Sequence, residues 1–223
     1  MWKVVRRILV FLFIAQLAYI LLCRWVNPPI TLTQMSNLNY GLKRDMIPYS
    51  KMGRNIKLAA IAGEDQLFAE HNGFDTKSIK RAVEFNKKHP KRRRGASTIS
   101  QQTAKNVFLW QGGGFFRKGL EVYFTFMIET LWPKERILQT YLNVAEMGKG
   151  VYGVQAAAKK YFNKNAANLT VQEAAQIISC LPNPKKFTVK PLSPYVSRRS
   201  AFLIQQMRQL SGNPEIEELL SDQ

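Results

Sequence analysis

The stretch LAAIAGEDQLFAEHNGFD, residues 58–75, decides how this sequence is expected to fold. It begins with a nearly uncharged apolar run and continues directly into two adjacent carboxylates, Glu64 and Asp65. The whole chain carries 33 Lys and Arg against 15 Asp and Glu, so the rest of the composition does not account for an acidic pair at this place. The pair therefore needs an explanation of its own.

Apolar spacing predicts that this stretch forms a helix over 57–71. Glu64, Phe68 and His71 would then share one face of the helix. Asp65 would lie beside that face. A carboxylate flanked by apolar residues is desolvated, which raises its pKa and suits it to general acid or base work. The alternative is an exposed acidic pair, with the histidine satisfied near the helix end.

The composition favours a globular domain that prefers anionic partners. Hydrophobic residues make up 46% of the 223 residues and charged residues 22%, which is typical of a folded chain with a sizeable core. The net charge of +18 attracts polyanions, namely nucleic acid, anionic lipid headgroups or phosphorylated substrates. Charge alone does not choose among these three.

An apolar segment near the N-terminus helps to decide among these three classes of anionic partner. Residues 8–23 read ILVFLFIAQLAYILLC, contain no charge and follow three basic residues, Lys3, Arg6 and Arg7. We expect an uncleaved membrane anchor rather than a cleaved signal peptide or a buried core helix, because no A-x-A-like cleavage site follows. The preceding positive charge predicts a cytoplasmic N-terminus and a domain on the far side of the membrane. That location argues against nucleic acid as a partner.

Helical spacing continues through most of the remaining chain, without a series of alternating strands, so the expected fold class is all-α. The predicted helical segments are 56–71, 76–86, 98–109, 118–131, 134–147, 153–162, 170–181 and 194–210. We divide the chain into a cytoplasmic stub with the anchor (1–26), a linker and start of the domain (27–55), the main domain (56–212) and a C-terminal tail (213–223). Cys23 and Cys180 are poorly placed to pair and give no zinc or redox motif.

A second informative stretch is GASTISQQTAKN, residues 95–106. Ser97 or Thr98 can cap a helix here, and Thr98 with Gln101 fits a capping box. A helix start offers free backbone N–H groups, which bind anions. The stretch therefore predicts a capped helix whose first turn could face a phosphate.

Side chains on this helix add to that interpretation. Thr98, Gln102 and Lys105 would share one face. A hydroxyl, a carboxamide and an ammonium together can hold a phosphate and a sugar. The alternative is an ordinary capped helix whose polar residues face water.

The stretch RKGLE, residues 117–121, places two cations and a carboxylate on one helix turn. Arg117 and Lys118 stand four and three residues before Glu121. The group could hold a pyrophosphate, directly or through a divalent ion. The alternative is a surface ion pair of little energetic consequence.

Two further stretches are assigned less specific roles. Residues 134–164 are expected to be mostly core, with Asn143 and Tyr161 as candidate cleft residues. The basic run KKHPKRRR, residues 87–94, resembles a nucleic-acid patch by composition. In an extracytoplasmic domain it is more simply a solvated loop near anionic lipid, without a catalytic role.

Together these stretches resemble the motifs of the family 51 glycosyltransferases, the peptidoglycan glycan polymerases. The matching segments are E-D-x-x-F-x-x-H-x-G at 64–73, G-G-S-T-I-x-Q-Q-x-x-K-N at 95–106, R-K-x-x-E at 117–121 and the long fourth motif at 134–164. Ala96 replaces the second glycine of the family pattern. The chain is most similar to the monofunctional members, and it contains no S-x-x-K motif, so we expect no transpeptidase activity.

The resemblance implies an all-α fold with a lysozyme-like helical lobe, a small membrane-associated jaw and one preceding transmembrane helix. It also implies a single pass through the bacterial cytoplasmic (inner) membrane, with the catalytic domain on the periplasmic side. We expect the jaw around 74–95 and 110–127. The aromatic residues expected to face the membrane are Phe108, Trp110, Phe115, Phe116, Tyr123, Phe124 and Phe126.

The resemblance further implies a polymerase that joins a lipid-linked nascent glycan to lipid II. Glu64 would be the general base that deprotonates the acceptor 4-hydroxyl, giving a β-1,4 link with inversion. Lys105, Arg117 and Lys118 would stabilise the departing undecaprenyl pyrophosphate. Glu121 would position those cations or bind a divalent ion. The two carboxylates should be well separated, since a sugar hydroxyl must fit between them.

The other motif residues would orient the substrate or support the site. Thr98, Gln102 and Asn106 would orient sugar or phosphate. The expected supporting residues are Asp65, Phe68, His71, Ser97 and Gln101. No cofactor should be required, although a Mg or Mn ion could contact Glu121. Membrane lipids and proteins of cell-wall synthesis or division are the other implied partners.

Two other classes of protein remain open. A lysozyme-like enzyme that cleaves peptidoglycan would share the fold and a catalytic glutamate, but would have little need for Lys105, Arg117 and Lys118. A non-catalytic basic membrane protein that binds anionic lipid would tolerate loss of Glu64, and its binding would weaken steeply with salt.

Overall fold

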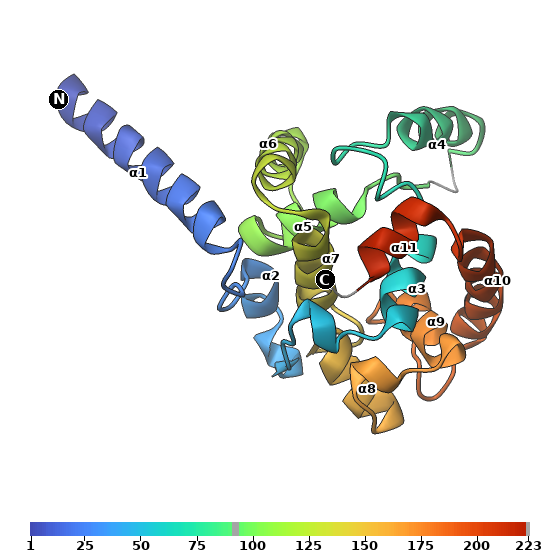
Figure 1. Ribbon diagram of the computed structural model, residues 1–223. Coiled ribbons are helices and arrows are strands. Elements are labelled where there is room, and N and C mark those ends of the chain that lie inside the picture. The colour runs from blue at the N-terminus through green and yellow to red at the C-terminus, as the bar shows by residue number, and fades with distance from the viewer. Residues whose placement is uncertain (91–93, 222–223) are drawn as a thin grey trace.

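The all-α prediction is confirmed. The structure, a computed structural model, describes residues 1–90 and 94–221, and nearly all regular structure in these ranges is helical (Figure 1). The α-helices are α1 (Trp2–Leu22), α2 (Leu32–Met35), α3 (Arg54–Glu64), α4 (Thr76–Lys88), α5 (Ile99–Phe108), α6 (Phe115–Leu131), α7 (Lys134–Val144), α8 (Val154–Phe162), α9 (Val171–Ser179), α10 (Pro194–Leu210) and α11 (Pro214–Leu220). The 3₁₀ helices are η1 (Leu38–Tyr40), η2 (Tyr49–Lys51) and η3 (Ala166–Asn168), and the strands are β1 (Lys43–Arg44) and β2 (Val151–Tyr152). Part of the basic run 87–94, residues 91–93, lies outside the described residues.

Helix α3 lies at the centre of the domain because its side chains are small and apolar. Every residue from Ile56 to Ala62 is buried, and α3 contacts α7, α9, α10 and α11 (Figure 1). A Cβ on Gly63 would lie 2.9 Å from the side chain of Ile178 and 3.4 Å from that of Leu203. Helices α9 and α10 therefore approach α3 as closely as a glycine allows.

Helix α3 ends at Glu64, so the predicted continuous helix over 57–71 is wrong. Asp65 has an extended backbone with φ of −162°. Its carboxylate accepts a hydrogen bond from Ile99 N (3.0 Å) and lies 2.8 Å from His71 Nε2. These contacts hold the chain away from the helix axis, and apolar spacing alone did not indicate them.

The predicted capping box of α5 is confirmed. Thr98 Oγ1 accepts a hydrogen bond from Gln101 N (3.1 Å), and the Gln101 carboxamide oxygen accepts one from Thr98 N (3.1 Å). Both donors would otherwise lack a partner at the helix start. The box therefore fixes where α5 begins and which of its residues share a face.

Residues 27–55 carry more structure than a linker. Helix α2 packs against α5, and β1 pairs in parallel with β2, with Lys43 opposite Val151. A Cβ on Gly150 would lie only 2.5 Å from Tyr40 O. A glycine at this position therefore lets the early segment lie directly against the β2 turn.

The two ends of the chain are packed differently. At the C-terminus, where we expected a tail over 213–223, α11 buries Ile216 and Leu219 and contacts α3. At the N-terminus, α1 is long and apolar enough to cross a membrane. Its residues through Ala15 are exposed, whereas Ile20 is fully buried. Figure 1 shows the first part of α1 projecting away from the other helices.

A substitution at Gly148 tests how closely the chain packs just before β2. A Cβ added at Gly148, which has φ of +156°, would lie 1.9 Å from the hydroxyl of Tyr161, and this hydroxyl donates to Met147 O (3.0 Å). Gly148→Ala should lower the free energy of unfolding by roughly 1–3 kcal/mol, the usual cost of overpacking, as measured by thermal unfolding of the full chain in detergent. In a Tyr161→Phe background the same substitution should cost much less, and equal costs in both backgrounds would contradict this packing.

Candidate active site

Glu64, the last residue of α3, has a side chain that is only 14% exposed. One of its oxygens accepts a hydrogen bond from Gln102 Nε2 (2.9 Å), and the other lies 3.7 Å from the Arg199 guanidinium. Burial raises the pKa of Glu64, while the Gln102 hydrogen bond and the Arg199 charge oppose that rise. A desolvated carboxylate with a nearby cation fits the requirements of a general base close to neutral pH.

Gln102 connects Glu64 to helix α7. Its Nε2 donates to Glu64, and its Oε1 lies 3.4 Å from the hydroxyl of Tyr141, which donates to it. Tyr141 is buried, and this burial raises its pKa well above the ordinary value, so the phenol stays a neutral donor. We predicted that Gln102 orients the substrate; in the structure its carboxamide holds Glu64.

Asp65 and His71 brace the loop that follows α3. His71 Nδ1 accepts a hydrogen bond from Gly73 N (3.1 Å), so Nε2 carries the proton that Asp65 accepts. The second oxygen of Asp65 accepts from Ile99 N, at the first residue of α5, and the Thr98 hydroxyl donates to Gly73 O (2.7 Å). The loop and the start of α5 are therefore tied together, beside Glu64.

The other motif residues differ in burial and in their contacts. Thr98, predicted to bind substrate, is buried, and its hydroxyl both accepts from Gln101 N and donates to a loop carbonyl. It supports the helix start, and its contact with substrate stays a prediction. Ser97 is exposed. Phe68 is fully buried, with the Lys134 ammonium 4.6 Å from its ring centroid.

A buried carboxylate organises the predicted cations on α6. The Glu121 side chain is 4% exposed; one oxygen lies 2.7 Å from Arg117 Nη1, and the other forms an ion pair with Lys118. This burial excludes the alternative of an ordinary surface ion pair. Because both carboxylate oxygens are engaged, the two cations are held on one side of α6.

Lys105 links the two carboxylates electrostatically. Burial lowers its pKa, and the negative charges of Glu121 and Glu64 act in the opposite direction. The neighbouring cations of α6 lower it further. A partly desolvated ammonium beside two other cations is an environment that a bound phosphate would stabilise.

A cavity of about 360 Å³ lies beside these groups. The motif residues on its wall are Gln102, Lys105, Asn106 and Tyr141. Its opposite wall contains Asn37, Glu146 and Lys185, which sequence reasoning did not place in the site. Lys185 donates to Asn37 Oδ1 (2.7 Å), and burial raises the pKa of Glu146. These residues come from distant segments, and no spacing pattern connects them.

Arg199 on α10 is the other residue that sequence reasoning missed. Besides facing Glu64, it donates a hydrogen bond to Gly63 O (3.2 Å), at the end of α3. A signal did exist in the sequence. Arg199 stands three residues after Val196 and four before Leu203, both buried, so it lies on the buried face of α10. A cation on an apolar helix face indicates a buried anionic partner.

The two candidate cleft residues lie in the interior instead. The Asn143 carboxamide exchanges hydrogen bonds of 3.1 and 2.9 Å with the backbone of Ile47. The Tyr161 hydroxyl donates to Met147 O. Both residues hold the core together and do not face the cavity.

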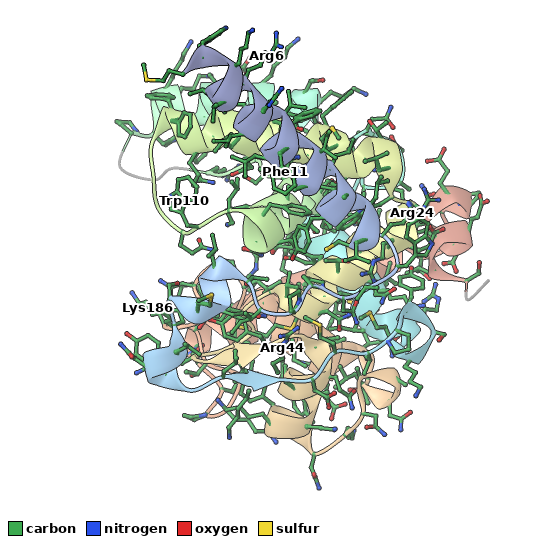
Figure 2. All side chains as sticks on the ribbon, turned by 90° about the vertical axis from the view of Figure 1, so that its left-hand side faces the viewer. Arg6, Phe11, Arg24, Arg44, Trp110 and Lys186 are labelled. Carbon is green, nitrogen blue, oxygen red and sulfur yellow. The ribbon has the colours of Figure 1, made fainter. Side chains whose placement is uncertain are left out.

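The aromatic residues predicted to face the membrane differ in exposure. Phe126 is 60% exposed, whereas Tyr123 is partly buried and accepts a hydrogen bond from Gln16. Phe108 and Phe124 stack on each other, with ring centroids 4.9 Å apart, and pack against the core. Phe115 and Phe116 are 98% and 77% exposed. Trp110, labelled in Figure 2, lies in the loop before α6 and is also exposed. The exposed residues can contact lipid directly, and this contact remains a prediction.

The brace around Asp65 can be tested by its contribution to stability. Asp65→Asn removes the charge from a buried carboxylate that is hydrogen-bonded to His71 and Ile99 N, so the free energy of unfolding should fall by roughly 1–3 kcal/mol. Asp45→Asn is the matched control, because the ion pair of Asp45 with Lys159 is exposed and should contribute at most about 1 kcal/mol. Thermal unfolding of both variants in detergent checks this, and similar losses in the two would contradict the brace.

Known proteins with similar sequences provide independent information. A family model described as Transglycosylase matches residues 31–208. The chain is 45% identical over 210 residues to a biosynthetic peptidoglycan transglycosylase of Aeromonas hydrophila, which covers 92% of this chain and 89% of that relative. Identity to relatives of the same name is 46% over 210 residues in Pseudomonas savastanoi pv. phaseolicola (91% and 89% covered) and 51% over 178 residues in Escherichia coli (80% and 74% covered). The chain therefore belongs to the transglycosylase family of peptidoglycan glycosyltransferases.

Proposed function

We propose that this protein polymerises peptidoglycan glycan chains, transferring a lipid-linked nascent glycan to lipid II and releasing undecaprenyl pyrophosphate. The observation that carries the proposal is the arrangement around Lys105. This ammonium interacts electrostatically both with Glu64, a buried carboxylate suited to proton abstraction, and with Glu121 and the two cations that Glu121 holds. Transfer from a pyrophosphate donor to a sugar hydroxyl needs both a base and an anion-stabilising group.

In the proposed reaction Glu64 accepts the proton of the acceptor 4-hydroxyl. The hydroxyl oxygen attacks the anomeric carbon of the donor from the face opposite the pyrophosphate. A C–O bond forms as the bond to the pyrophosphate oxygen breaks, and the configuration inverts to give a β-1,4 link. Gln102 holds the Glu64 carboxylate in place, so that little reorientation is needed at the moment of transfer.

The leaving group carries the electron pair away as a pyrophosphate anion. Lys105, Arg117 and Lys118 stabilise its charge, and Asn106 on the cavity wall can donate to a sugar or phosphate oxygen. Glu121 keeps the α6 cations aligned before the substrate binds. This preorganisation is the role that we assign to the second carboxylate.

The residues around Glu121 do not fit a divalent ion well. Both of its oxygens are engaged by cations, and no group of three or more His, Cys, Asp or Glu side chains that could hold a metal occurs in the part of the chain that the structure describes. A Mg or Mn ion would have to replace Arg117 or Lys118. We therefore derive no step through a metal and propose that no cofactor is required.

We further propose that α1 is an uncleaved single-pass anchor in the inner membrane, with the N-terminus in the cytoplasm. The length and apolarity of α1 support a spanning helix, and Lys3, Arg6 and Arg7 in its first two turns support this orientation. The cavity would then face lipid-linked substrates on the periplasmic side. Membrane lipids and proteins of cell-wall synthesis or division are the proposed partners, and transpeptidase activity is not, since the sequence contains no S-x-x-K motif.

The two other classes fit the geometry less well. A peptidoglycan-cleaving enzyme does not need three cations around one buried carboxylate, because its substrate has no pyrophosphate. A non-catalytic lipid-binding protein does not need a buried Glu64 oriented by Gln102 and Arg199. Both classes nevertheless remain distinguishable outcomes of the experiment below.

Loss of the Glu64 carboxylate tests the reaction directly. Glu64→Gln keeps the size of the side chain but cannot accept the proton, so polymerisation of labelled lipid II should fall by about 10²–10⁴-fold. The products are resolved by size in detergent, with the exposed Glu84→Gln as a control that should retain the full ladder. A ladder that survives in Glu64→Gln would reassign the base. Shortening of preformed glycan by the wild type, without a ladder, would favour the cleaving enzyme, and no effect on either substrate would favour the lipid-binding protein.

Arg199 should control the pH at which the enzyme becomes active. Glu64 acts as a base only when deprotonated, so activity rises as pH increases through its pKa, which burial raises and Arg199 lowers. Arg199→Met should therefore raise that pKa and move the acidic limb of the kcat/KM profile to higher pH. Arg198→Met, which removes an exposed neighbouring cation, should leave the limb in place. An unchanged limb in Arg199→Met would show that Arg199 does not act on the base.

A further inference from the structure

Helix α1 contacts the rest of the protein along its last third, residues 16–22, which we call its covered end. Residues through Ala15 are exposed, whereas Gln16 and Tyr19 are partly buried and Ile20 is fully buried. Figure 2 shows the helix lengthwise, with Arg6 near its free end and Arg24 near its other end. The covered end lies against α6. A simple tether would be exposed along its whole length, so the covered end has a structural role.

A polar contact lies at the start of the covered end of α1. Gln16 Nε2 donates to the hydroxyl of Tyr123 on α6 (3.1 Å). One turn further, the ring of Tyr19 packs edge-on against Phe108 of α5, with centroids 6.0 Å apart. A glutamine within an apolar span is costly unless it is paired. Here the partner comes from the catalytic domain.

The end of α1 is capped by side chains from the catalytic domain. The Arg136 guanidinium donates to Cys23 O (3.0 and 2.8 Å) and to Val26 O (2.8 Å), and Trp132 Nε1 donates to Ile20 O (2.9 Å). The last carbonyls of a helix have no partner within it. Arg136 is only 7% exposed, so this cap is a built interior contact rather than a surface encounter.

The helix that supplies this cap also reaches the candidate active site. Arg136 and Tyr141 both belong to α7, and Tyr141 donates to Gln102, which holds Glu64. One rigid helix therefore joins the end of the anchor to the proposed base. Movement of the anchor relative to α7 would break several buried hydrogen bonds at once.

We propose that the covered end of α1 is a structural part of the catalytic domain, and that Arg136 is a positioning residue that sets the height and tilt of the active-site cavity relative to the bilayer. At 1.5 Å per residue, Gln16 lies about 9 Å from the helix end at Leu22. With the end of α1 placed at the surface of the hydrocarbon layer, Tyr123 on α6 lies at about that depth within the layer. A lipid-linked substrate then meets the cavity at a fixed height. The docking itself does not depend on the reaction; only its effect on rate rests on the proposed function.

Thiol cross-linking in lipid vesicles tests the docking without any enzyme assay. Gln16→Cys combined with Tyr123→Cys should cross-link through a short bifunctional thiol reagent. Ile14→Cys with Tyr123→Cys is the matched control, because Ile14 is exposed and lies about 200° around the helix from Gln16. The single variants control for the two natural cysteines. Adding Arg136→Gln should lower the yield of the first pair. Equal yields in the two pairs would overturn the proposal.

Kinetics in vesicles and in detergent test the positioning role. Gln16→Leu removes the hydrogen bond to Tyr123 and replaces no residue of the buried core. This variant and Arg136→Gln should raise the KM for lipid II in vesicles by roughly three- to tenfold, consistent with loss of one or two membrane-buried hydrogen bonds. The kcat in vesicles and both constants in detergent should stay near wild type. Ile14→Leu should change nothing. An unchanged KM in both variants would overturn the positioning role, and a wild type without activity would refute the proposed function while the cross-links still decide the docking.

Discussion

The site depends on the burial of one negative charge, the Glu64 carboxylate, at the C-terminal end of the central helix. Burial and the negative end of the helix dipole both disfavour the anion. The apolar residues that place α3 in the core thus create an unfavourable position for a charge. Gln102 and Arg199 offset that cost from two other helices. The result is a carboxylate that is basic enough to accept a proton and still stabilised when it is charged.

The other buried carboxylates of the motif stretches organise donors rather than transfer protons. Asp65 joins His71 to the first N–H group of α5, and so fixes the loop that covers the end of α3. Glu121 does the same for Arg117 and its neighbouring lysine on α6. In a chain of net charge +18, these few acids decide where the cations point. Glu121 thereby holds two cations of α6 in fixed positions, while Lys105 lines the cavity itself.

The contacts of the anchor extend this organisation to the membrane. The end of α1 is held by Arg136 and Trp132, which flank the start of α7, and α7 also carries the tyrosine that orients Gln102. The side chains that cap the anchor and the tyrosine that orients Gln102 thus lie on one short stretch of the chain. If α1 spans the bilayer as proposed, these contacts hold the cavity at a fixed position relative to the membrane. This arrangement suits an enzyme whose substrates are confined to a plane.

The sequence by itself determined the features that depend on neighbouring residues. Helical periodicity located most of the long helices, although it missed α2 and α11. Short spacings located the α5 capping box and the Glu121 cation group, because their partners lie within one turn of the chain. Only the tertiary structure decided where α3 ends, since Asp65 is held by the distant Ile99 N–H group. It also decided that Arg199 faces Glu64 and that the anchor docks on α6. These contacts join residues far apart in the sequence, and no local periodicity carries information about which distant groups will meet.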